Sequence, residues 1–295
     1  MKQGGENPKK HHYVPSSYLK RFTDSSGFLH VYDRVSGLWR RQKPNKVMHC
    51  RDYYYQEWAP AHVDPNILEK TLGQWLEKEA AHLIDTIIQS PNDLSDEEMA
   101  TFLLYLELQR IRVPRQAETA KMLMRKTILD LVPEEITAGI RDGELQLNMS
   151  DSARFDYMRM MCGQLLPWFA SMEWEIIEAE GGSSFITTDS PVSLYNSDCT
   201  PPAEAGIALA GTIVFFPLSS RYLLSMRHPK FQLNPSISRL EIIADPKPGN
   251  RSLSITRGTV WNSEVVKRLN WKLIQLSDRL VVGQSKEVFH DLLPN

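Results

Sequence analysis

Two adjacent histidines near the N-terminus, His11 and His12, are the residues of this sequence best suited to chemistry. They open the stretch HHYVP, and the cations Lys20 and Arg21 follow shortly after it. Histidine is the commonest general acid or base and a frequent metal ligand, because its charge changes near neutral pH. Neighbouring residues face different ways on a strand or a helix, so both could ligate one metal only on an irregular backbone. We expect one histidine to act in the site and the other to orient the backbone or a nearby carboxylate; the alternative is one buried, hydrogen-bonded histidine and one exposed histidine.

Two further groups of polar residues, one on a predicted strand and one on a predicted helix, could complete a site. Asp189 ends a predicted strand just before Pro191, where a carboxylate can serve as a base or a metal ligand. The alternative there is an Asx turn, in which the side chain bonds its own backbone. Arg110, Arg112 and Arg115 stand at the end of a predicted helix, where they could bind phosphate or form an exposed basic helix end. Arg110 continues the apolar face at four-residue spacing, so it is expected to point inward.

The charge of the chain is unevenly distributed. The 295 residues carry a net charge of −2, yet residues 1–51 hold eleven Lys or Arg against three acids, a local charge of +8. Such asymmetry is typical of proteins with an anionic partner, such as a nucleic acid or a nucleotide. The alternative is that a basic N-terminal layer packs on an acidic body.

Several function classes are disfavoured because their motifs are missing. The sequence has no GxxxxGK[ST], GxGxxG or GxSxG pattern, and no HExxH or zinc-finger spacing. The cofactor is not predicted: a divalent metal is possible, but the sequence indicates no set of ligands for it. The three cysteines lie far apart without a CxxC pair, which predicts a reducing, cytoplasmic setting. No apolar run reaches the roughly 18 residues needed to cross a bilayer, and the N-terminus lacks the apolar core of a secretion signal, so no membrane partner is expected.

Local signals place helices in the middle of the chain. Short strands are expected between residues 28 and 42. Asp64-Pro65 is expected to begin a helical region, because aspartate suits the N-cap and proline the first helical position. Ser95 and Glu98 have the spacing of a capping box within that region, and Ser150-Asp151 is expected to cap its last helix, to about residue 166.

From residue 173 the apolar period changes to two, which is typical of strands. Residues 174–180 and 184–188, joined by two glycines, have the pattern of a hairpin. Further short strands are expected, among them 240–244 and 279–282. Helical periodicity returns only at about 260–275.

This order of elements predicts an α+β fold. We expect a largely antiparallel sheet built from N- and C-terminal segments, with a helical middle region. Residues 1–295 are expected to form a single domain. Its parts would be basic N-terminal strands at 1–60, a helical region at 61–172 and a sheet-rich region at 173–295.

Five blocks in order along the chain also resemble a known family. They are HHYVPSSYLKRFTDSSGFLHVYDRVSG, NKVMHCRDYYY, ELQRIRVPR, FITTDSPVSL and FFPLSS. They resemble the bacterial domain-of-unknown-function family numbered 4238. The resemblance implies a prokaryotic intracellular protein, and some relatives look like single-gene anti-phage defence proteins. It also implies that His11, His12, Arg110 and Asp189 belong together, but it implies no established activity.

Two functions follow from these observations as hypotheses. The first is an enzyme that acts on phosphoesters, such as a nuclease or nucleotide hydrolase. One of His11 and His12 would be its general acid or base, and Asp189 would orient it or hold a metal. The anion-binding side chains would be Lys20, Arg21 and Arg110. The second is a non-catalytic module that binds a nucleic acid or a phage protein, in which the HHYVP stretch is a structural knot.

Overall fold

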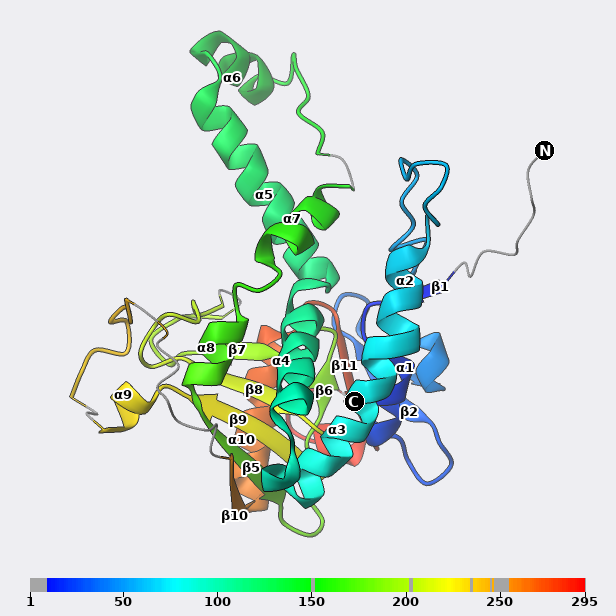
Figure 1. Ribbon diagram of the computed structural model, residues 1–295, viewed down its shortest axis with the longest axis vertical. Coiled ribbons are helices and arrows are strands. Elements are labelled where there is room, and N and C mark those ends of the chain that lie inside the picture. The colour runs from blue at the N-terminus through cyan, green and yellow to red at the C-terminus, as the bar shows by residue number, and fades with distance from the viewer. Residues whose placement is uncertain are drawn as a thin grey trace.

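The computed structural model describes residues 10–149, 152–201, 204–233, 236–244, 246 and 255–294. Figure 1 shows a body of sheets and helices from which the outer part of helix α5 and helix α6 project as an arm. Within these described ranges, no helix is both long enough and apolar enough to span a membrane.

The elements fall into three groups along the chain. The N-terminal group is β1 (Lys10–His12), α1 (Ser16–Leu19), η1 (Lys20–Phe22), β2 (Leu29–Asp33), β3 (Leu38–Gln42), η2 (Pro44–Lys46) and β4 (His49–Arg51). The middle group is α2 (Ile67–Thr71), the π-helix η3 (Leu72–Leu76), α3 (Glu77–Gln89), η4 (Pro91–Asp93), α4 (Asp96–Ile111), α5 (Pro114–Leu131), α6 (Glu134–Arg141), α7 (Ala153–Met161) and α8 (Leu166–Ser171). The C-terminal group is β5 (Glu173–Ala179), β6 (Thr187–Thr188), β7 (Ser193–Tyr195), β8 (Ile213–Pro217), β9 (Tyr222–Arg227), α9 (Pro229–Leu233), β10 (Ile255–Trp261), α10 (Ser263–Leu276), β11 (Leu280–Gly283) and η5 (Glu287–Phe289).

The described strands form three sheets. The largest has the order β10-β5-β9-β8-β7, in which only the pairing of β10 with β5 is parallel. A four-stranded antiparallel sheet has the order β3-β2-β11-β6, and β1 pairs with β4. Leu280 of β11 stands opposite Asp33 of β2, so the N- and C-terminal segments share a sheet. The predicted α+β fold, with mostly antiparallel strands and a helical middle, is confirmed.

The five-stranded sheet is covered on both faces. Along β5, Trp174 and Ile176 pack into a core formed with the N-terminal segment, α3 and α4. Ile177 and Ala179 belong to a second core, which includes the inner face of α10. Successive side chains of a strand point to opposite faces, so β5, which has buried apolar residues on both faces, supplies both cores. In Figure 1, α10 lies behind the sheet while α4 and α8 lie in front of it.

Some local expectations are confirmed and others are wrong. The capping box of Ser95 and Glu98 is present at the start of α4. The expected hairpin of 174–180 with 184–188 is wrong: β5 pairs with β9 and β10, whereas the very short β6 pairs with β11. Residues 240–244 form no described strand beyond an isolated bridge of Ile242 to Leu209.

The first helix of the middle region begins later than expected. Asp64 does not begin the helix; its Oδ1 accepts a hydrogen bond from the backbone N–H of Asn66, and α2 begins at Ile67. Aspartate here stabilises the turn that precedes the helix. The expected cap at 150–151 lies outside the described residues, and α7 begins at Ala153. β10, which no sequence pattern indicated, is interrupted at Gly258, where φ is +99°.

Candidate functional site

The two histidines of the HHYVP stretch lie in the short strand β1, which pairs with β4. His11 stands opposite Cys50 and His12 opposite His49 in the pairing of β1 with β4. The backbone N–H of Tyr13 then donates to the carbonyl of Met48 at 3.1 Å. Because the backbone is extended, the two histidine side chains point to opposite sides.

His11 points into the protein and is fully buried. Its Nδ1 accepts a hydrogen bond of 2.8 Å from the backbone N–H of Tyr54, and its ring stacks on the Tyr54 ring with centroids 5.8 Å apart. An Nδ1 that accepts is deprotonated, so this geometry favours the neutral imidazole. His11 thus fastens the HHYVP stretch to the aromatic turn that follows β4.

His12 lies on the other side and is only half-buried. Its ring meets the ring of His49 edge-on, with centroids 5.5 Å apart. Burial, and then the neighbouring His49, lower the pKa of His12 to about 4, and burial also lowers the pKa of His49. Both imidazoles are therefore neutral near pH 7. The Nε2 of His12 has no hydrogen-bond partner among the described residues.

Helix α4 contacts the HHYVP stretch at Tyr13. The side-chain amide of Gln109 donates to the Tyr13 carbonyl at 3.0 Å. The buried Arg112 in turn donates to Gln109 Oε1 at 2.6 Å and to Glu77 Oε1 at 2.8 Å. From the sequence, Arg112 was expected only to bind phosphate or to form an exposed helix end, and Gln109 was given no role; the structure instead buries Arg112 and bonds it to Gln109 and Glu77. Their three-residue spacing on a helix places both on one side, which was the available signal.

Arg110 points inward as expected, but toward a different partner. It is 8% exposed, and its guanidinium pairs with both carboxylate oxygens of Glu204. Arg115 lies 3.7 Å from the same carboxylate, and Gln116 donates to it at 3.2 Å. The pKa of Glu204 is lowered by these cations in spite of its burial. The charge of Arg110 is thus offset within the protein.

Asp189 is buried and binds backbone rather than another side chain. Its carboxylate accepts from the N–H groups of Asp278, Arg279 and Leu280 at 3.0, 2.7 and 2.7 Å. It therefore bonds a segment remote in sequence, not its own turn as in an Asx turn. Burial nevertheless raises the pKa of Asp189 to about 6. Its charge raises the pKa of Tyr13, after the larger effect of burial, which places Asp189 beside the HHYVP stretch.

The two cations that follow the motif differ in surroundings. Lys20 is exposed. Arg21 pairs with Asp85 of α3 at 2.6 Å and donates to the Ala81 carbonyl at 2.7 Å. Arg21 thus packs the basic N-terminal layer on an acidic helix, as one of the two interpretations of the charge asymmetry expects. Lys2 and Lys9, which contribute to that asymmetry, lie outside the described residues.

The structure also has a groove that the sequence did not indicate. It encloses about 630 Å³ on the outer side of α10. Its lining includes Tyr195, Glu264, Lys267, Arg268, Trp271 and Lys272. The Trp271 side chain is 44% exposed, and the Lys272 ammonium lies 4.2 Å from the centroid of the Tyr195 ring. On sequence alone, this face of α10 is indistinguishable from an ordinary solvated face.

No group of three or more His, Cys, Asp or Glu side chains in the described ranges is arranged to hold a metal ion. The structure thus joins the HHYVP stretch to α4 by a hydrogen bond at Tyr13, and Asp189 is close enough to raise the pKa of Tyr13. Arg110 pairs with Glu204 and also donates to the Val192 carbonyl at 3.5 Å, three residues after Asp189, whereas Arg21 pairs with Asp85 of α3. A shared catalytic role for these residues stays a prediction.

Fold and site together define a mixed α+β protein whose N-terminal motif is anchored by a buried histidine. Comparison with protein-family models matches residues 10–287 to the family described as "Protein of unknown function (DUF4238)". The chain belongs to the DUF4238 family, as the resemblance implied. Comparisons with curated proteins and with solved structures found no significant match.

Proposed function

We propose that the protein is a binding module for single-stranded nucleic acid, that the groove on α10 holds the strand, and that the HHYVP stretch is structural. The observation that carries this proposal is the exposed Trp271 beside Lys272 and Tyr195 in one groove. Proteins that bind single strands stack bases on aromatic side chains and attract the phosphates with nearby cations. The pairing of His11 with Tyr54 supports the structural role of the motif.

The charges around the groove fit a polyanion. Lys267, Arg268 and Lys272 line it, against the carboxylates Glu264 and Asp291. Lys267 pairs with Asp291 at 2.8 Å and Arg268 with Glu264 at 3.1 Å. These pairs are exposed and therefore weak, so phosphates can compete for the cations.

The basic N-terminal hairpin adjoins the same region. Trp39 of β3 packs edge-on against Phe289, and its indole N–H donates to the Pro294 carbonyl at 3.0 Å. The same C-terminal turn carries Asp291, the partner of Lys267 on α10. The exposed Arg40 and the other cations of the hairpin are thus close in the fold to the groove, where they would extend a path for phosphates.

We expect a fluorescently labelled single-stranded oligonucleotide to bind the full protein at low salt, as measured by anisotropy. Trp271→Ala is expected to weaken binding about tenfold, because one stacked base contributes about 1–3 kcal/mol. Trp75→Ala is the matched control, since Trp75 is 50% exposed but lies in the π-helix η3. Affinity should also fall steeply as salt is raised. Equal affinities for Trp271→Ala and wild type, or no binding at low salt, would contradict the proposal.

A phosphoester-cleaving enzyme is the second candidate, and His12 is the observation that favours it. The Nε2 of His12 is buried and has no partner among the described residues, and the imidazole is neutral near pH 7. Its low pKa makes it a weak base, so a substrate phosphate beside it would have to raise that pKa for it to accept a proton. A nuclease and nucleotide-hydrolysis screen of purified protein tests it. We expect His12→Ala to lower any activity about 100-fold or more, while the exposed His62→Ala keeps it. Full activity in a folded His12→Ala protein would remove His12 from the chemistry.

The biological setting of either function is proposed to be defence against phage. This part rests on the resemblance alone. A plaque assay on bacteria that express the wild-type or Trp271→Ala protein would test it together with the groove.

A further inference from the structure

The arm, defined as residues 121–149, is poorly covered by the rest of the protein. All of it is described, and Gly139 is its only buried residue. Its contacts are mostly within the arm itself: the Leu145 N–H donates to the Gly139 carbonyl at 2.9 Å, Arg125 to the Leu147 carbonyl at 3.3 Å, and the Thr137 hydroxyl to the Leu129 carbonyl at 3.5 Å. Short helices without tertiary packing are only marginally stable in water. The arm therefore lacks within this chain the packing that would normally stabilise it.

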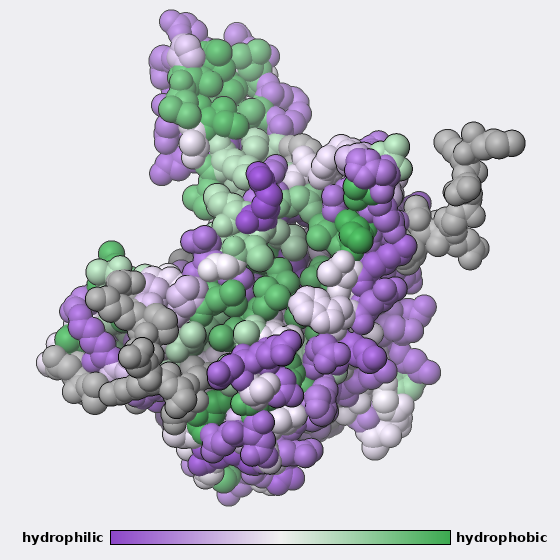
Figure 2. Space-filling model, in the orientation of Figure 1, coloured by the Kyte–Doolittle hydropathy of each residue, from purple (hydrophilic) through white to green (hydrophobic). Residues whose placement is uncertain are grey.

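The arm also exposes large apolar side chains. Figure 2 shows hydrophobic residues gathered over its outer part. The exposed fractions are Met122 63%, Leu123 54%, Leu131 79%, Ile136 41% and Leu145 48%. A gathered apolar surface of this kind marks an interaction site more often than a solvated one.

Three exposed residues form a stripe along α5. Leu123, Thr127 and Leu131 follow one another at four-residue steps, which places them on one face of the helix. The Thr127 hydroxyl donates to the Leu123 carbonyl at 3.1 Å, so its polar atom is already bonded within the helix. A small residue between two leucines allows a second helix to approach closely at that point.

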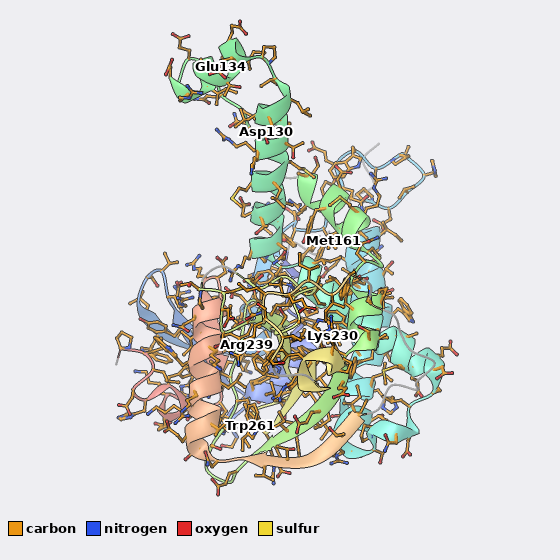
Figure 3. All side chains as sticks on the ribbon, turned by 90° about the vertical axis from the view of Figure 1, so that its left-hand side faces the viewer. Asp130, Glu134, Met161, Lys230, Arg239 and Trp261 are labelled. Carbon is orange, nitrogen blue, oxygen red and sulfur yellow. The ribbon has the colours of Figure 1, made fainter. Side chains whose placement is uncertain are left out.

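The charges of the arm are separated along its length. The inner part of the arm carries the cations Lys121, Arg125 and Lys126, with no acid among them. From residue 130 to 144 there is one cation, Arg141, against the acids Asp130, Glu134, Glu135, Asp142 and Glu144. Figure 3 shows Asp130 and Glu134 toward the outer end of the arm, away from the body. An antiparallel copy of the same arm is complementary in charge to this pattern, whereas a parallel copy would place like charges together.

We propose that α5 packs antiparallel on α5 of a second copy of this chain, about a two-fold axis that passes beside Thr127. With Thr127 on the axis, Leu123 of each copy lies opposite Leu131 of the other, because both are four residues from the centre. The inner cations of each copy then face Asp130 and Glu134 of the other. Every such contact is made twice in a two-fold pair. This self-association goes beyond the proposed binding of nucleic acid and uses a different surface.

Sedimentation analysis of the full protein over a range of concentrations tests the proposal. Wild type is expected to form dimers, and Leu131→Glu to raise the dimer dissociation constant about tenfold or more, because it replaces an apolar side chain of the stripe by a charge opposite Leu123 of the other copy. Val35→Glu is the matched control: Val35 is 77% exposed but lies in the β2–β3 turn. A wild-type protein that stays monomeric, or a dimer unchanged by Leu131→Glu, would overturn the proposal.

A second experiment tests the position of the axis. A residue on a two-fold axis meets its own copy, so Thr127→Cys should form a disulfide-linked dimer on mild oxidation. Met122→Cys, which is also exposed but lies off the stripe, should not. Both variants are made with Cys162→Ser, because Cys162 is itself exposed. Equal crosslinking at the two positions, or none at Thr127→Cys, would refute this register.

Discussion

At the residue scale, the two histidines of the HHYVP stretch have different environments although they are neighbours. His11 is fully buried and bonded to the Tyr54 N–H, while His12 is half-buried beside His49. The difference follows from the extended backbone of β1, which sends adjacent side chains to opposite sides. His11 has the contacts of an anchor, so His12 is the histidine left for any chemistry.

The low pKa of His12 makes stability depend on pH. The pKa is about 4 in the folded protein and about 6.5 in the unfolded chain, so the unfolded state binds more protons between these values. The contribution of His12 to stability is therefore complete above pH 6.5 and is lost as the pH falls toward 4. Between pH 7 and pH 5 we expect wild type to lose about 1 kcal/mol more stability than His12→Gln, since solvent screens part of the effect.

Urea unfolding at the two pH values measures this difference. His62→Gln is the matched control, because His62 is exposed. Identical losses in wild type and His12→Gln would mean that His12 is not held neutral by its surroundings.

At the element scale, Asp189 connects the end of β6 to the start of β11 by hydrogen bonds. It accepts three backbone hydrogen bonds from residues 278–280, and its own N–H donates to the Leu280 carbonyl at 3.0 Å. The segment it holds also includes Arg279, which binds Asp33 of β2 through two nitrogens. One carboxylate thus orders the junction at which the N- and C-terminal strands join.

Asp189→Ala is expected to loosen this junction. It leaves three N–H groups without their acceptor, at a cost of about 2 kcal/mol after the relief of a buried charge. Hydrogen exchange should accelerate at the amides of Arg279 and Leu280. Asp278→Ala is the control, because it removes a neighbouring carboxylate but keeps all three bonds to Asp189. Unchanged exchange in Asp189→Ala would show that the hydrogen bonds of Asp189 are not needed to order this junction.

At the scale of the whole molecule, the parts of the fold that sequence predicts are the local ones. The capping box at Ser95 and the strands β2 and β3 depend on neighbours within a few residues. The pairing of β6 with β11 does not depend on near neighbours. The two glycines before β6 suggested a hairpin with the preceding strand, and β6, with two residues, has too short a pattern to indicate its true partner. Strand pairing over long separations is set by the packing of the whole chain rather than by local pattern.

The candidate site divides in the same way. Sequence marked the HHYVP stretch, Arg110 and Asp189 because their residue types and positions are locally distinctive. Their partners, Tyr54, Glu204 and the backbone at 278–280, come from distant segments that no local pattern connects to them. The groove on α10 needed the structure for a further reason: its aromatic and cationic side chains acquire meaning only when Tyr195 is brought beside them.

The place of β11 between β2 and β6 has a consequence for the newly made chain. On the ribosome, the hairpin of β2 and β3 emerges early, and its open edge has no strand to pair with until the helical middle and the five-stranded sheet have been synthesised. An unpaired edge of this kind can pair with other chains. We therefore expect translation to leave an interval in which nascent chains depend on dilution or on a chaperone, and this interval closes only when β11 emerges.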